Sequence, residues 1–224
     1  MATIGADTEQ KGIALTGARD REVMADWIVH AVGIACGAVG AIVLLAMAAG
    51  SGAGQLVPVA VYVAGLLAML ICSAAYHVWR SPRHRDLLRR LDHAAIFVMI
   101  AATYTPIAAI ALHRPWDAAV VTAVWTVAGV GVVLKLVRPR AIESISVALY
   151  LLQGWIGLFA LQDLLASVPA DVLMMILLGG LVYSGGVVFH LSARRYSLAL
   201  WHACVLVGAG LHYIAIVSLM AQAV

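Results

Sequence analysis

Charged residues are scarce in this sequence. Asp, Glu, Lys and Arg make up only 11% of the 224 residues, whereas hydrophobic residues make up 64%. An ordinary soluble domain has about 25% charged residues, and so few polar side chains cannot cover a soluble globule of this length. The composition therefore predicts an integral membrane protein with several spans. The 14 basic residues form no basic surface interleaved with aromatics, so we expect no nucleic-acid partner.

The sequence also lacks the marks of a secreted protein. Its three cysteines, Cys36, Cys72 and Cys204, all lie inside apolar runs, which argues against a disulfide framework. The first 24 residues are polar and of mixed charge, without the apolar middle and small-residue cleavage site of a signal peptide. We therefore expect residues 1–24 to form a poorly ordered cytoplasmic tail, followed by a membrane domain over residues 25–224.

Long apolar runs are what the sequence does contain. A helix rises 1.5 Å per residue, so about 20 apolar residues cross the roughly 30 Å of hydrocarbon in a bilayer. Clusters of Gly, Ser, Pro or charged residues separate the runs from one another. The fold class that follows is an all-α seven-transmembrane helix bundle. Its predicted spans are residues 26–50, 56–79, 92–113, 116–135, 142–163, 171–192 and 197–221.

Basic residues are distributed unevenly around these runs. All of the 14 Lys and Arg residues except Arg114 lie in the tail or at and beyond the ends of the second, fourth and sixth runs. Loops rich in Lys and Arg stay on the cytoplasmic side of a membrane. The sequence therefore predicts a cytoplasmic N-terminus and, with an odd number of spans, an extracytoplasmic C-terminus.

Ionisable side chains gather at the predicted cytoplasmic ends of the runs. Such groups are costly in a bilayer, so they should face the bundle interior, pair with one another or bind a ligand. Imidazole and carboxylate groups are typical ligands of zinc, which takes three protein ligands and a water in catalytic sites. Asp92 is the only carboxylate that we expect within the membrane at this depth. The histidines that share its depth are His30, His77, His93, His190 and His202.

Simpler interpretations exist for each of these side chains. Asp92 fits the N-cap of the third helix, in a salt bridge with Arg89 or Arg90. A single histidine in a membrane helix is explained as well by a hydrogen bond to a neighbouring helix as by a metal. The metal hypothesis therefore depends on His77, Asp92 and His202 lying together at one depth.

Three sequence blocks carry a resemblance to a known family. They are "SAAYH", "LDHAAIFVMIAATYTP" and "LWHACVLVGAGLHYIAI", accompanied by "WIVHAVG" in the first run. In combination they resemble the hemolysin III family, the bacterial branch of the progestin and adipoQ receptor family, which includes the adiponectin receptors. The resemblance implies a seven-helix protein of the bacterial inner membrane with a Zn²⁺ ion near its cytoplasmic face. It also implies kinship with alkaline ceramidases, and hence zinc-dependent hydrolysis of a lipid amide.

The resemblance assigns roles to individual residues. His77 matches the metal ligand of the second helix, and His202 matches the second histidine of an HxxxH pair in the seventh helix. Asp92 matches the acid that holds the catalytic water, and Ser73 matches a serine near it.

One position departs from the family pattern. The first histidine of the HxxxH pair falls at residue 198, which is leucine in this sequence. Either zinc is absent or weakly held, or another imidazole replaces this histidine. His190 is the best substitute, because only a short loop separates the sixth helix from the seventh, and His30 and His93 are poorer candidates.

The residues leave several functions open. The leading hypothesis is a zinc-dependent hydrolase that acts on a membrane lipid, with Asp92 as general base and Ser73 as a hydrogen-bond donor. The alternatives are a receptor or membrane-homeostasis protein that keeps the metal as a structural element, and a cytolytic activity, for which we find no amphipathic pore-forming segment. Nothing in the sequence selects ceramide over another lipid.

Overall fold

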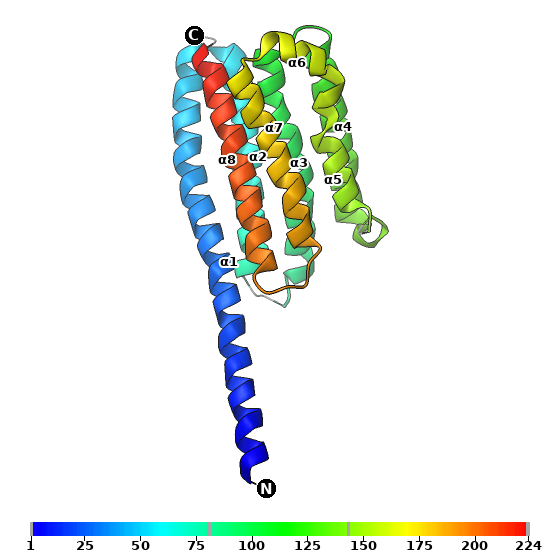
Figure 1. The fold of residues 1–224 in the computed structure, drawn as a ribbon. Helices are drawn as coiled ribbons and strands as arrows, with labels where there is room; N and C mark the ends of the chain where they lie inside the picture. The colour runs from blue at the N-terminus through cyan, green and yellow to red at the C-terminus, as the bar shows by residue number, and fades with distance from the viewer. Residues whose placement is uncertain (1, 80–81, 143, 223–224) are drawn as a thin grey trace.

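The protein is a bundle of seven long apolar helical spans, as the sequence predicts (Figure 1). The computed structural model describes residues 2–79, 82–142 and 144–222, and every regular element in those ranges is a helix. In order, the elements are α1 (Ala2–Ser51), α2 (Ala53–Val78), α3 (Arg85–Ala111), α4 (Trp116–Val137), η1 (Pro139–Ala141), α5 (Ser146–Gly154), η2 (Ile156–Ala160), α6 (Leu161–Ser167), α7 (Ala170–His190) and α8 (Ser197–Gln222).

The first helix is longer than its apolar run. Residues 2–24, which we expected to be a poorly ordered tail, instead continue α1, and its first half extends beyond the other helices (Figure 1). Ala, Glu and Arg, which favour helices, each occur more than once in this segment. Because the membrane span already forms the helix nucleus, each added residue contributes a hydrogen bond without a new nucleation cost.

The fifth span is broken in the middle. The sequence predicts one helix over residues 142–163, but the structure has α5, the 3-10 segment η2 and α6 in its place. Tyr104 of α3 stabilises the break, because its hydroxyl donates to the carbonyl of Gly154 and accepts the N–H of Gly157 at 3.0 Å. Buried protein partners are what allow irregular backbone at membrane depth.

Close helix packing brings the polar residues of different spans together. At Gly65 of α2, an added Cβ would lie 2.5 Å from the Cβ of Ala102 in α3, so a larger residue there would push these helices apart. At Gly186 of α7, the same addition would lie 2.7 Å from the Cβ of Cys204 in α8. Small residues at such positions are typical of membrane helix pairs. We call the end of the bundle where α2 ends and α8 begins the cluster end.

Candidate metal centre

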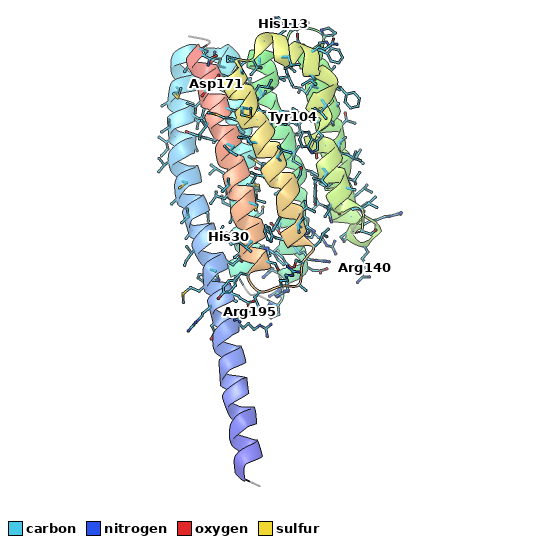
Figure 2. The ribbon with its side chains drawn as sticks, in the orientation of Figure 1. His30, Tyr104, His113, Arg140, Asp171 and Arg195 are labelled. Carbon is cyan, nitrogen blue, oxygen red and sulfur yellow. The ribbon has the colours of Figure 1, made fainter. Side chains whose placement is uncertain are left out.

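A group of buried polar side chains lies at the cluster end of the bundle. Asp26 and His30 come from α1, where a spacing of four residues puts them on one face, and His202 comes from α8. One ligand atom from each lies within 4.8 Å of the others, so the three residues form a group able to hold a metal ion. Figure 2 shows His30 at this end of the bundle.

The hydrogen bonding within this group leaves a nitrogen without a protein partner. Nδ1 of His202 lies 2.6 Å from a carboxylate oxygen of Asp26. Nε2 of His30 is buried and has no hydrogen-bond partner among the described residues, and its distance to Asp26, 3.7 Å, is too long for one. A carboxylate on one ring nitrogen is the usual support of a metal-binding histidine, and buried polar atoms without partners are rare. The donor set therefore fits a metal.

Three of the sequence-predicted residues lie beside this group. The ring of His77, on α2, lies 4.6 Å from the ring of His202 and 5.7 Å from the ring of His30, centroid to centroid. Nε2 of His77 is 3.7 Å from a carboxylate oxygen of Asp92 on α3, and Ser73 lies within hydrogen-bonding reach of the same carboxylate. Residues from four helices thus meet here.

The interpretation of Asp92 as a helix cap is wrong. Helix α3 begins at Arg85, seven residues before the predicted start, so Asp92 lies inside the helix and is buried. Arg90, one of the expected salt-bridge partners, instead contacts Asp86 at 3.2 Å and donates to the carbonyl of Leu136. The buried Asp92 carboxylate faces His77 rather than the helix N-terminus.

His190 lies near the group but outside it. Its ring is 4.9 Å from the ring of Trp201, and its side chain lines the same cavity as His77 and His202. Its role as third metal ligand stays a prediction. His93 points elsewhere, with Nδ1 3.3 Å from the ammonium nitrogen of Lys135.

The sequence interpretation missed Asp26. We expected Asp92 to be the only carboxylate in the membrane, but Asp26 is just as well buried. It was overlooked because it stands at the junction of the polar tail and the first apolar run. The sequence does contain a signal for Asp26. In "DWIVH" it stands four residues before His30, so the two side chains lie one helical turn apart on the same face.

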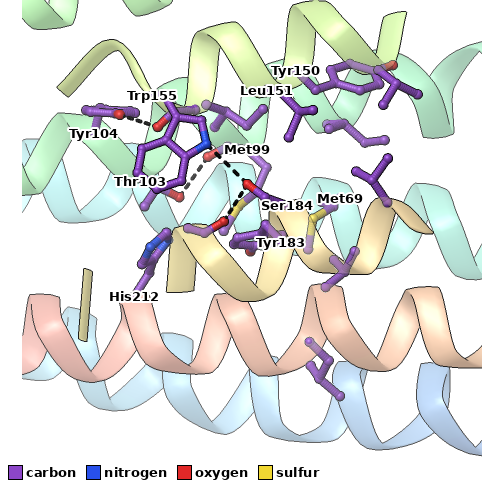
Figure 3. Close-up of a pocket in the computed structure, with 18 of the residues that line it drawn as sticks. Met69, Met99, Thr103, Tyr104, Tyr150, Leu151, Trp155, Tyr183, Ser184 and His212 are labelled. Carbon is purple, nitrogen blue, oxygen red and sulfur yellow. Dashed lines mark hydrogen bonds between the residues drawn. The ribbon is translucent and has the colours of Figure 1, made fainter. Parts of the chain in front are cut away.

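The cluster closes one end of a large apolar cavity. The cavity has a volume of about 940 Å³ and runs between α2, α3, α5 and α7, which contribute Met69, Met99, Leu151 and Tyr183 to its walls (Figure 3). The Trp155 indole crosses from the broken span to α7, where it donates to Ser184 at 3.1 Å. Ligand pockets are typically 300–1,000 Å³, so this cavity is large enough for a long apolar molecule.

A second cavity meets the cluster from the other side. Its volume is about 560 Å³, and Arg19, Arg85 and Arg194 are among its lining residues. His77 and Leu198 line both cavities. The buried histidines therefore lie between an apolar space inside the bundle and a polar space at its end, which Glu22 and Asp26 line together with the arginines.

A serine, a histidine and an aspartate also meet at the opposite end, around the His113 marked in Figure 2. The Ser167 hydroxyl, at 3.1 Å, and the Asp163 carboxylate, at 3.2 Å, both contact Nδ1 of His113. A catalytic triad needs its serine and its acid on different ring nitrogens. This set is therefore no triad. Asp163 also accepts the backbone N–H of His113 at 2.7 Å, which joins α6 to the end of α3.

Comparison with known proteins identifies the family of this chain. The chain is 29% identical over 195 residues to Hemolysin-3 of Bacillus cereus, and the matched region covers 86% of this chain and 89% of that protein. It is 30% identical over 190 residues to the Hemolysin-3 homolog of Bacillus subtilis (strain 168), covering 84% and 89%. It is 27% identical over 169 residues to the human Monocyte to macrophage differentiation factor, covering 70% and 67%. The family model described as Haemolysin-III related matches residues 19–213, so this multi-pass membrane protein belongs to the haemolysin-III related family.

Proposed function

We propose that this protein is a zinc-dependent hydrolase of lipid amides in the bacterial inner membrane. The observation that carries the proposal is the position of the buried imidazole and carboxylate groups, which close the polar end of a cavity of about 940 Å³. A lipid whose acyl chain occupied the cavity would have its polar linkage beside these groups. Zinc held there would polarise the amide carbonyl and acidify a water molecule.

The ligand set that we propose is His30, His77 and His202. Three imidazoles and an open position are typical of catalytic zinc. The three rings lie within 5.7 Å of one another, centroid to centroid, and Nε2 of His30 has no hydrogen-bond partner among the described residues. Asp26 would hold the His202 ring in orientation through Nδ1. His190, the substitute favoured by the sequence, is the rival third ligand.

Asp92 and Ser73 carry the proton chemistry in this proposal. The Asp92 carboxylate is buried beside His77 and accepts a proton from the attacking water as general base. It then returns the proton to the amine that leaves. The Ser73 hydroxyl, within reach of Asp92, donates a hydrogen bond to the oxygen that becomes negatively charged.

A structural role for the metal is the competing proposal. The contact between Asp26 and His202 already joins the first helix to the last, so a metal there would strengthen the same connection without catalysis. This would suit a receptor or a membrane-homeostasis protein. Incubating the purified protein with a fluorescent N-acyl lipid and measuring the fatty acid released distinguishes the hydrolase from a protein with a structural metal. Release of fatty acid that His77→Ala abolishes supports the hydrolase, and no release by zinc-loaded wild type contradicts it.

A further inference from the structure

Three arginines line the smaller cavity at the cluster end of the bundle. They come from separate parts of the chain: Arg19 from α1, Arg85 from the start of α3 and Arg194 from the loop between α7 and α8. The rule that basic loops stay in the cytoplasm explains why arginines lie at this end, but it does not require that they line one cavity. A cavity lined by charges of one sign attracts ligands of the opposite sign.

The carboxylates nearby do not neutralise these three charges. Among the residues that the structure describes, no acidic side chain forms an ion pair with any of the three guanidinium groups. The two acids that line the cavity have other partners: Glu22 contacts Arg195 at 3.0 Å, and Asp26 contacts His202 at 2.6 Å. The cavity wall therefore keeps a positive charge that a ligand can offset.

The N-terminus of α8 adds hydrogen-bond donors to the same cavity. Ser197, Leu198 and Ala199 form the first turn of α8, and all three line the cavity. Within the described part of the chain, the backbone N–H groups of Leu198 and Ala199 have no backbone acceptor. N–H groups at a helix N-terminus, where the helix dipole is positive, favour anions. They act here in addition to the three arginines.

Tyr76 positions one of the arginines beside the metal group. The guanidinium carbon of Arg85 lies 5.7 Å from the centroid of the Tyr76 ring. A guanidinium that lies over a ring uses its face, so the N–H groups at its edge can still donate to a ligand. The ring of Tyr76 is also 4.6 Å from the ring of His77, centroid to centroid, and both residues line both cavities.

We propose that Arg19, Arg85 and Arg194 bind a phosphate group in the smaller cavity, with the first turn of α8 as an additional donor. A guanidinium presents its N–H groups in a fork that matches two oxygens of a phosphate. Three cations also suit the double charge of a phosphate monoester better than the single charge of a carboxylate.

The size of the cavity indicates what else the ligand carries. Its volume of about 560 Å³ lies in the range of pockets that hold whole small molecules, so a phosphate group alone would leave most of it empty. The ligand is therefore a phosphate ester, which is either the headgroup of a membrane lipid or a water-soluble molecule. The site goes beyond the hydrolase proposal, because it needs neither a metal nor turnover.

Equilibrium binding to the full-length protein in a neutral detergent, before and after chelation of metal, tests this site. The radiolabelled probes are glycerol 3-phosphate, phosphatidate, and diacylglycerol with the same chains but no phosphate. Each of Arg19→Gln, Arg85→Gln and Arg194→Gln should weaken the binding of a phosphate probe about tenfold, because each removes a charge-assisted hydrogen bond. Diacylglycerol binding should not change. Arg83→Gln, which removes an exposed positive charge outside the cavity, is the matched control and should have little effect.

The two phosphate probes identify the source of the ligand. Binding of glycerol 3-phosphate that the three variants weaken supports a soluble phosphate ester, and such binding of phosphatidate alone supports a lipid headgroup. Failure of wild type to bind either probe would overturn the site, and so would unchanged affinity in all three variants. An equal loss in Arg83→Gln would also overturn it, because the effect would then be one of general surface charge. The three arginines are exposed, so their replacement should leave the melting temperature close to that of wild type.

Discussion

Asp26 on the first helix and His202 on the last are joined by a contact of 2.6 Å, although 176 positions separate them in the chain. This contact closes the bundle between α1 and α8. Because Asp26 and His202 also belong to the group able to hold a metal ion, the same contact links the closure of the bundle to that group.

The zinc ligands form the first prediction. We expect the purified wild-type protein to bind about one zinc per chain, and His77→Ala or His202→Ala to lose most of it, because each removes one of three imidazoles. Zinc bound only by the folded state stabilises that state, so the melting temperature of both variants in excess zinc should fall below that of wild type. Metal analysis and thermal melting measure the two effects. Unchanged zinc content in both variants would contradict the assignment.

The third ligand is the subject of the second prediction. If His30 is that ligand, His30→Ala should lose as much zinc as His77→Ala, and His190→Ala should keep its zinc. The opposite result would favour His190. Leu198 lies one turn before His202, and its side chain lines both cavities. Adding Leu198→His to the deficient variant should therefore restore binding, since position 198 is where the family pattern has a histidine.

Asp26 should tune the affinity for the metal without being essential to it. The change Asp26→Asn keeps the size of the side chain but removes the charge that orients His202. Loss of such an orienting partner typically lowers metal affinity about 10- to 100-fold. Competition with a chelator of known affinity measures this shift. Complete loss of zinc would instead make Asp26 a direct ligand.

Asp92 separates catalysis from metal binding. We expect Asp92→Asn to lower the turnover of an N-acyl lipid about 10²- to 10⁴-fold, because asparagine cannot accept the proton of water. Zinc content should stay close to the wild-type value, since Asp92 contacts His77 but lies outside the Asp26, His30 and His202 group. Asp86→Asn, which changes an exposed acid on the same helix, is the matched control. Full activity in Asp92→Asn would eliminate the proposed mechanism.

Topology is the remaining prediction. A reporter fused after Val224 should be active outside the cytoplasm, and one inserted between His84 and Arg85 should be active inside it. The reason is the asymmetry of basic residues, of which only Arg114 lies on the predicted outer side. A cytoplasmic reporter at Val224 would show that the predicted orientation is wrong and that the metal group and the arginine-containing cavity lie on the outer side.

The sequence predicts the spans well because their length and hydropathy are local properties. It also predicts that His77, Asp92 and His202 lie together, since loop charges fix which helix ends share a side. The break in the fifth span was missed, because it depends on Tyr104, which is 50 positions from Gly154. The early start of α3 was missed too, because Arg85, Arg89 and Arg90 resemble a loop until their place at the rim of the bundle is known.

The position of His77 between two cavities has a consequence for reagents. A polar molecule in the smaller cavity and an apolar molecule in the larger cavity can both reach the imidazole of His77. The polar molecule does not have to enter the apolar cavity to do so. If the protein is the hydrolase that we propose, the two products would start in different surroundings: the polar product beside Arg19, Arg85 and Arg194, and the acyl product in the apolar cavity.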